Sequence, residues 1–188
     1  MRRAPDARCL SRTRQSRPDG GGARWGASTE HSEDGSGGGC LACDLIAGTE
    51  PLPGGTIGRT GHWTVEHCVG PLGLGTLVVK PLRHVVHVAD LTAEESAELG
   101  PLLRRTSEAV TAVTSPEQVY VCLWSHAGRV PGHIHFVVQP ARADDLARHD
   151  AYGPGLQVAM FAAGRVPRVA DVADVCDQLR AALAGPAR

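Results

Sequence analysis

Lysine is nearly absent from this sequence, in which Lys80 is the only one and arginine carries the remaining positive charge. We interpret this imbalance as a bias of genomic coding rather than as a sign of function. Acidic and basic side chains almost cancel, so that the formal net charge is −1 at pH 7. Such a chain has no strong field to attract an anionic polymer or surface. We therefore expect neither a nucleic acid nor a membrane as a partner.

Long apolar runs are missing as well. No stretch of the chain approaches the roughly 20 apolar residues that span a bilayer. The arginine-rich N-terminus also has no continuous apolar segment of the kind that secretory signals contain. We therefore expect a cytoplasmic location. In a reducing compartment the six cysteines would be thiols rather than disulfides.

A hydrophobic period is absent from residues 1–39, which are rich in glycine, serine and arginine. Such a segment cannot bury enough apolar surface to offset the entropy of ordering, so the sequence predicts a disordered tail, or an over-long start of the chain. Residues 40–142 carry the pattern of one folded domain with a real core. Residues 143–188 read as a helical extension.

The order of expected elements indicates an α+β fold, with a mostly antiparallel sheet packed with a long helix. The long helix opens with the capping-box pattern of Thr92 and Glu95 and runs toward Val113. The pair Gly100-Pro101 falls inside it and should kink or interrupt it. We expect the other helices over 41–47, 143–149, 155–163 and 169–184, a strand or hairpin over 56–68, and strands over 74–80, 117–124 and 133–139.

The segment GHIHFVVQP, residues 132–140, carries two histidines in an apolar run. Its β-branched and aromatic residues favour a strand, whose side chains alternate between two faces. His133, His135, Val137 and Gln139 would then share one face. Neighbouring imidazoles are useful as metal ligands, or as a nucleophile with a helper, because neutral imidazole is available near physiological pH.

Cys40 and Cys43 have the two-residue spacing of a metal-binding or redox pair. A structural zinc ion needs four ligands, so this pair would supply half of such a site. A redox role is the alternative, but the βαβ context of thioredoxin-like proteins does not surround the pair. A third reading is that both are ordinary cysteines at the start of a helix.

Taken together, these motifs resemble the histidine triad (HIT) superfamily, and the resemblance covers residues 40–142. The family motif alternates three histidines with apolar residues, whereas here Val137 holds the third histidine position and gives His-x-His-x-Val. The matching segments follow in the family's order: CLAC from Cys40, GTLVVKPLRH ending at His84, DLTAEE at the long helix, and PGHIHF.

The resemblance implies a HIT-like fold and an enzyme that attacks the α-phosphorus of a nucleotide through its middle histidine, here His135. The implied activity is that of a hydrolase or nucleotidyl transferase with a nucleotidyl-histidine intermediate. The implied substrates are small molecules, dinucleoside polyphosphates such as diadenosine polyphosphates, or nucleotide phosphoramidates. We expect substrate contacts from Gly128, Arg129 and His126 in the preceding loop, and from Gln139. The resemblance also implies a homodimer, an expectation that the Gly100-Pro101 pair weakens.

The resemblance also implies how the zinc site would be completed. Some members of the superfamily, the galactose-1-phosphate uridylyltransferases among them, add a histidine before the long helix and the first histidine of the triad. The matching residues here are His84 and His133, with His87 as an alternative to His84. The expected cofactor is therefore structural zinc, bound by Cys40, Cys43, His84 and His133.

Two departures from the family pattern keep other functions open. Val137 replaces the third histidine, and of the stretch that normally holds the ribose hydroxyls only Glu66 could serve. The first alternative is a catalytically weak or inactive HIT-like protein that still binds a nucleotide. The second is a zinc-stabilised interaction protein with no nucleotide site.

Overall fold

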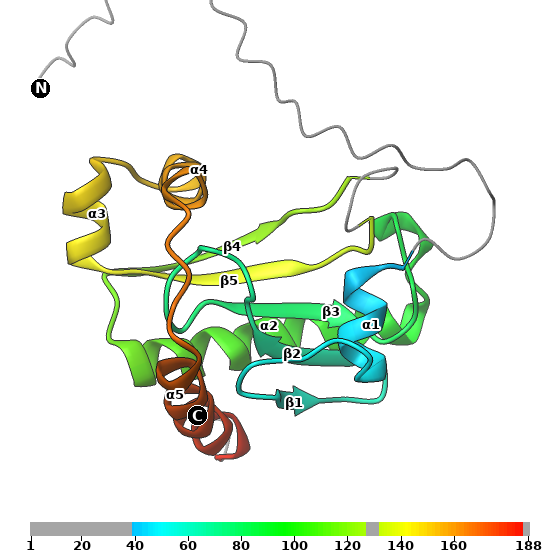
Figure 1. Cartoon of the computed structure of the whole chain (residues 1–188). Coiled ribbons are helices and arrows are strands. Elements are labelled where there is room, and N and C mark those ends of the chain that lie inside the picture. Colours follow the sequence, from blue (N-terminus) through cyan, green and yellow to red (C-terminus); the bar gives the residue numbers. More distant parts are fainter. Residues whose placement is uncertain (1–38, 127–131, 186–188) are drawn as a thin grey trace, which may run out of the picture. The chain divides into compact units, whose positions relative to one another are not determined.

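The computed structural model describes residues 39–126 and 132–185 as helices around one sheet (Figure 1). The strands are β1 (Thr56–Arg59), β2 (Trp63–His67), β3 (Leu77–Pro81), β4 (Gln118–Leu123) and β5 (Phe136–Ala141). The helices are α1 (Leu41–Ala47), the short 3-10 helix η1 (Val88–Asp90), α2 (Ala93–Thr114), α3 (Ala143–His149), α4 (Pro154–Ala163) and α5 (Val169–Ala184).

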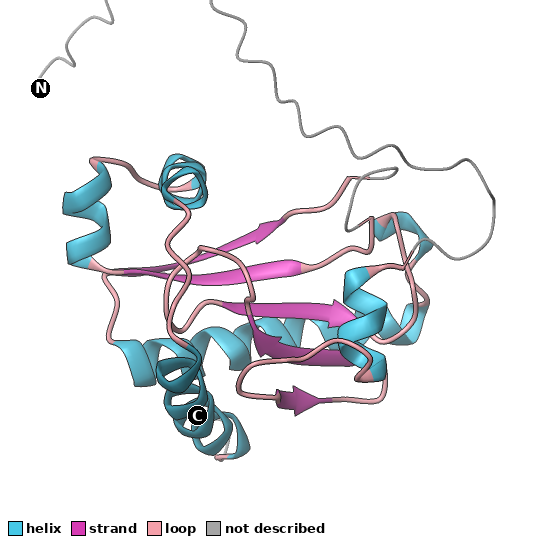
Figure 2. Cartoon of the chain, viewed as in Figure 1, coloured by secondary structure: helices cyan, strands magenta, loops and turns pink. Residues whose placement is uncertain are grey.

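The five strands form one sheet in the order β1-β2-β3-β5-β4, and every neighbouring pair is antiparallel (Figure 2). The expected α+β fold with a mostly antiparallel sheet is therefore confirmed. In the centre of the sheet, Val78 of β3 lies opposite Glu66 of β2 and opposite Val137 of β5. This register decides which side chains meet on each face.

One face of the sheet packs against α2 and α5 and forms the main apolar core. The C-terminal helix α5 is an integral part of this core, because its apolar stripe is buried with the residues of the sheet. The buried members are Ile57, Trp63, Val65, Leu77, Val79, Leu102, Ala109, Val110, Val138, Val172, Val175, Cys176 and Leu179.

The opposite face of the sheet carries buried polar side chains, Thr64, Glu66, Lys80 and Gln139. A second apolar cluster covers part of this face, where α3 and α4 pack on β5. Burial of a polar group costs free energy unless the group has a hydrogen-bond or ion-pair partner. This face is therefore the expected place of a functional site.

Helix α2 begins with the expected capping box. The Thr92 hydroxyl accepts a hydrogen bond from the Glu95 amide at 3.2 Å, and the Glu95 carboxylate accepts one from the Thr92 amide at 2.8 Å. The predicted interruption at Gly100-Pro101 is wrong, because α2 is continuous from Ala93 to Thr114. Proline removes one backbone hydrogen bond from a helix, but the buried face of α2 is held against the sheet along its length.

The strand predicted over 133–139 begins later than expected, at Phe136. The Ile134 amide donates to the Val85 carbonyl at 2.8 Å, so the segment before β5 pairs with the loop that follows β3. The His135 carbonyl accepts a hydrogen bond from the amide of Trp124, the residue after β4, at 3.2 Å. The helices expected over 41–47, 143–149, 155–163 and 169–184 are confirmed within one residue.

The predicted tail lies outside the described residues, apart from Gly39. Within the described part of the chain, no helix combines the length and the apolar character needed to cross a membrane.

Candidate metal centre and active site

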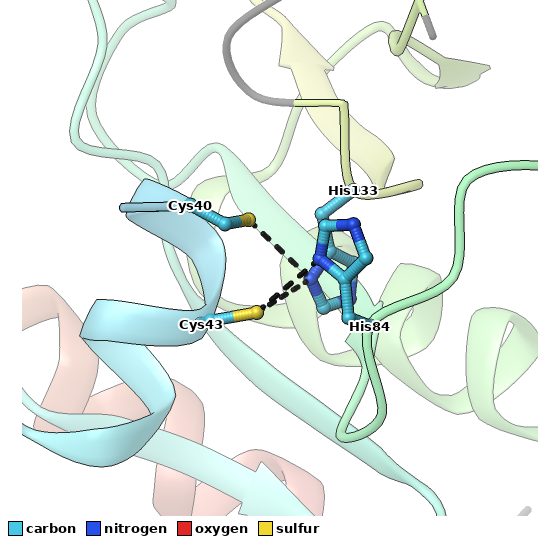
Figure 3. A group of neighbouring side chains, drawn as sticks. All are labelled: Cys40, Cys43, His84 and His133. Atoms are coloured by element: carbon cyan, nitrogen blue, oxygen red, sulfur yellow. Dashed lines mark hydrogen bonds between the residues drawn. The ribbon is translucent and has the colours of Figure 1, made fainter. Parts of the chain in front are cut away.

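Three separate segments bring four metal-binding side chains together. Cys40 is the N-cap of α1 and Cys43 lies in its first turn, so the two thiols are one helical turn apart. His84 follows β3 and His133 precedes β5. The ligand atoms of these four residues all lie within 4.8 Å of one another, and Figure 3 shows the two thiols of α1 facing the two imidazoles.

The distances in this Cys₂His₂ cluster fit a tetrahedral zinc site. The Cys43 sulfur lies 3.4 Å from Nδ1 of His84 and 3.5 Å from Nδ1 of His133, and the Cys40 sulfur lies 3.8 Å from Nδ1 of His133. Tetrahedral zinc with ordinary bond lengths places sulfur and nitrogen ligands about 3.6 Å apart. The donor set and these three sulfur–nitrogen distances therefore suit zinc.

A hydrogen bond at Nε2 of His133 leaves Nδ1, the ring nitrogen that faces the thiols, available to bind a metal. Nε2 of His133 must donate to the Pro81 carbonyl, 3.0 Å away, because a carbonyl only accepts. That hydrogen bond leaves the lone pair of Nδ1 directed toward the thiols. A metal-bound histidine is usually held by such a hydrogen bond from its other ring nitrogen. Burial lowers the pKa of His133 to about 4, so its imidazole is neutral at physiological pH.

The Cys43 thiol needs a nearby cation to ionise at physiological pH. Burial, together with the neighbouring Cys40, raises the pKa of Cys43 to about 11. A divalent ion reverses this preference, because a coordinating thiol loses its proton. Among the described residues, the four-residue cluster is the only such group, and the alternative ligand His87 lies outside it and is exposed.

His135 lies in a cavity of about 240 Å³. Its Nδ1 donates to the backbone carbonyl of His133 at 3.0 Å, which leaves the lone pair on Nε2. Burial lowers the pKa of the His135 imidazole, so the neutral form dominates at physiological pH. A neutral imidazole whose orientation is fixed through its other nitrogen has the properties of a nucleophile.

Helix α1, the sheet, the loop after β2 and helix α4 line this cavity. Helix α1 contributes Leu41, Ala42 and Leu45, the strands β2, β3 and β5 contribute further residues, and His135 lines the cavity from just before β5. Two aromatic side chains also line it, Trp124 just after β4 and Phe161 of α4, and their ring centres are 6.4 Å apart. The cavity is therefore largely apolar with a small number of polar groups, as in small-molecule sites in general.

Similarity to known proteins is found among solved structures. No protein-family model matches the sequence, and no curated protein matches it. Among solved structures, a zinc-bound histidine triad family protein from Mycobacterium smegmatis is 22% identical, with 77% of this chain and 93% of that chain covered and a TM-score of 0.58. A hypothetical histidine triad nucleotide-binding protein from Sulfolobus tokodaii strain7 is 15% identical, with 77% and 91% covered and a TM-score of 0.60.

A Hit-like protein involved in cell-cycle regulation from Bartonella henselae is 14% identical, with 76% of this chain and 95% of that chain covered and a TM-score of 0.57. The three likenesses agree on one architecture over nearly the whole of each neighbour. The chain has the histidine triad fold. The resemblance read from the sequence is thereby confirmed at the level of fold, and the fold carries its motif at the start of β5.

Within the histidine triad fold, the position of the third histidine is occupied by Val137, which is buried beside the cavity of His135. Gln139, expected among the substrate contacts, does not line this cavity. Its side-chain amide is fully buried and donates to the Leu72 carbonyl at 3.1 Å and to the Met160 sulfur. His126 is exposed and is likewise not among the residues lining the cavity. Gly128 and Arg129 lie outside the described residues.

Two charged residues line this cavity, Lys80 and Glu66. Lys80 was not predicted from the sequence as a site residue, and Glu66 was considered only as a contact to the ribose. Lys80 lines the cavity and forms an ion pair with Glu66, and both side chains are buried. The available signal was the position of Lys80, a charged residue that ends an apolar strand. Glu66, which the sequence offered for the ribose, faces Lys80 in the structure.

Proposed function

We propose that the protein is a nucleotide hydrolase or nucleotidyl transferase that acts at the α-phosphate through His135. The observation that carries this proposal is the environment of His135, which lines the cavity with Nδ1 bound to the His133 carbonyl and Nε2 free to attack. The substrates proposed are dinucleoside polyphosphates or nucleotide phosphoramidates. The fold supports the proposal, since one structural neighbour is described as a nucleotide-binding protein.

The chemistry proceeds in two displacements. Nε2 of His135 forms a bond to the α-phosphorus, while the bond from phosphorus to the leaving oxygen or nitrogen breaks and the leaving group takes a proton from solvent. Water then attacks the nucleotidyl-histidine, the P–N bond breaks, and a nucleoside monophosphate leaves as His135 is restored. An acceptor other than water would make the second step a transfer.

We propose zinc as the cofactor, held by Cys40, Cys43, His84 and His133. Four protein ligands leave no open position, so the ion would serve structure and take no part in the displacement. Its contribution would be to join α1 to the segment that carries His135. The zinc-bound neighbour and the spacing of the four ligand atoms support this assignment.

The test is release of nucleoside monophosphate from diadenosine polyphosphates, adenosine phosphoramidates and nucleotide sugars, with zinc content measured in each preparation. We expect release by the wild type and loss in His135→Ala. The expected intermediate is a nucleotidyl adduct on His135, found by mass spectrometry after a rapid quench. His149→Ala, on α3 and outside both sites, is the matched control and should keep its activity. No release from folded, zinc-loaded wild type on any substrate would overturn the enzyme assignment.

The second candidate function is nucleotide binding without turnover. Val137 favours it, because valine can neither donate a proton nor stabilise charge. A rise in melting temperature with added nucleotide, together with no product, would identify this function.

A further inference from the structure

Lys80 and Glu66 form a buried ion pair that stability alone does not explain. Lys80 is 1% exposed and Glu66 is 3% exposed, and their charged ends are in contact. Removing two charges from water costs several kcal/mol per ion, and a well-packed apolar pair of the same volume is often as stable or more so. A buried lysine in this place, in a chain that otherwise uses arginine, is consistent with a second role.

The register of the sheet places this lysine beside the nucleophile. Val78 pairs with Val137 and Val79 with Phe136, and Lys80 and His135 are the next residues beyond this last pair on the two segments. Lys80 and His135 both line the cavity, in agreement with this register.

The side chain of Lys80 reaches toward the level of the missing histidine. Its ammonium contacts the carboxylate of Glu66, and Glu66 is level with Val78 and therefore with Val137 across the sheet. The ammonium is thus held on the β2 side of β3, level with Val137 along the strands, and at the cavity that His135 also lines. Among the described residues that line the cavity, Lys80 is the only lysine or arginine.

We infer that Lys80 binds the phosphate oxygens of the substrate and supplies the positive charge that Val137 cannot, with Glu66 holding the ammonium in place. This inference rests on the proposed function, because it assigns a phosphate group to the cavity of His135. Phosphoryl transfer is driven largely by positioning and by stabilising negative charge on the phosphate oxygens. A fixed cation in a cavity that excludes water is effective in this role.

The inferred ligand class is therefore a nucleotide phosphate. The experiment compares the binding of nucleotides, which carry a phosphate, with the binding of nucleosides, which lack one. Dissociation constants are measured by calorimetry for the four common nucleoside monophosphates and for their nucleosides. We expect the tightest monophosphate to bind the wild type at least about tenfold more tightly than its nucleoside, as one charge-assisted contact predicts. Lys80→Met should abolish this preference and lower turnover about 100-fold.

A second variant keeps the test valid if Lys80→Met leaves Glu66 buried without a partner and unfolds. The double variant Glu66→Gln/Lys80→Met removes both charges, so its melting temperature should stay near that of the wild type. It should nevertheless lack the preference for the monophosphate. Arg83→Met is the matched control, because Arg83 also pairs with a glutamate, Glu95, outside the cavity.

Each result decides one of two questions. A folded Lys80→Met or double variant that keeps the monophosphate preference overturns the role of Lys80, whether or not the wild type turns substrate over. A wild type that binds monophosphate and nucleoside equally, or neither, also overturns it. The proposed function is judged separately, by product release from the wild type and its loss in His135→Ala.

Discussion

The backbone carbonyl of His133 accepts the Nδ1 hydrogen bond of His135 at 3.0 Å, while the imidazole of His133 lies 3.5 Å from the Cys43 sulfur. The residue that completes the metal cluster therefore also fixes the tautomer and direction of the proposed nucleophile. A movement of a few tenths of an ångström at His133 would reach His135 directly. We expect loss of the metal to affect catalysis as well as stability.

Cys43→Ser should lower the bound zinc from about one ion per chain to a small fraction, because a four-ligand structural site tolerates no missing ligand. The variant should also melt at a lower temperature and lose activity, since α1 is no longer joined to the segment of His133. Elemental analysis and thermal melting measure the two effects. Cys122→Ser, a thiol on β4 outside the cluster, should match the wild type in zinc content. Equal zinc in both variants would refute the assignment.

Phe161→Ala should weaken nucleotide binding, because Phe161 and Trp124 line the cavity of His135 with their rings 6.4 Å apart. Loss of one aromatic contact costs about 0.5–1.5 kcal/mol, so we expect KM to rise roughly 3–10-fold with little change in kcat. Val158→Ala is the control, because Val158 is equally exposed on α4 but does not line the cavity. A KM for Phe161→Ala equal to that of the control would remove Phe161 from the binding site.

Trp63→Ala should be among the most damaging substitutions for stability. Trp63 is fully buried in the main core, and its indole N–H donates to the Glu95 carbonyl at 2.9 Å. Loss of a buried tryptophan costs about 3–5 kcal/mol of unfolding free energy. Leu123→Ala, at an exposed position on β4, should cost no more than about 0.5 kcal/mol. Chemical denaturation followed by circular dichroism compares the two; similar losses would mean that the core is misplaced.

Glu95 should make stability depend on pH in the acid range. The Arg83 guanidinium donates to both oxygens of Glu95, at 3.0 and 2.8 Å, and lowers the pKa of that carboxyl. A carboxyl with a lowered folded pKa stabilises the native state fully above its unfolded pKa of about 4.3, and this contribution is lost as the pH falls through the folded value. Glu95→Gln should therefore melt below the wild type at pH 7.

Below about pH 4 the melting temperatures of wild type and Glu95→Gln should converge, because the wild-type carboxyl is then also neutral. The control is Glu108→Gln, since Glu108 is paired on the exposed side of α2 and should change the melting temperature little at either pH. A difference between Glu95→Gln and wild type that is constant from pH 7 to pH 3 would contradict the assigned ion pair.

The sequence predicted much of the local structure, because the signals involved act over a few residues. The capping box of Thr92 and Glu95 marked the start of α2. The helix expected over 41–47 ends in the structure at Gly48, whose backbone is left-handed. The predicted interruption at Gly100-Pro101 was wrong, because the local signal was overridden by contacts with distant parts of the chain. Packing along the whole of α2 is a tertiary effect, and it outweighs the local cost of one proline.

The sequence by itself also determined the chemistry that is available: two cysteines one turn apart, two histidines two residues apart, and the motif that identified the fold. Only the tertiary structure decided where these groups act. It brought His84 and His133 to the cysteines, buried Gln139 away from the cavity, and set Lys80 beside His135. These relations depend on the pairing of β3 with its neighbour β2 and with β5, which is far away in the chain. A register shift of one residue would turn each side chain to the other face.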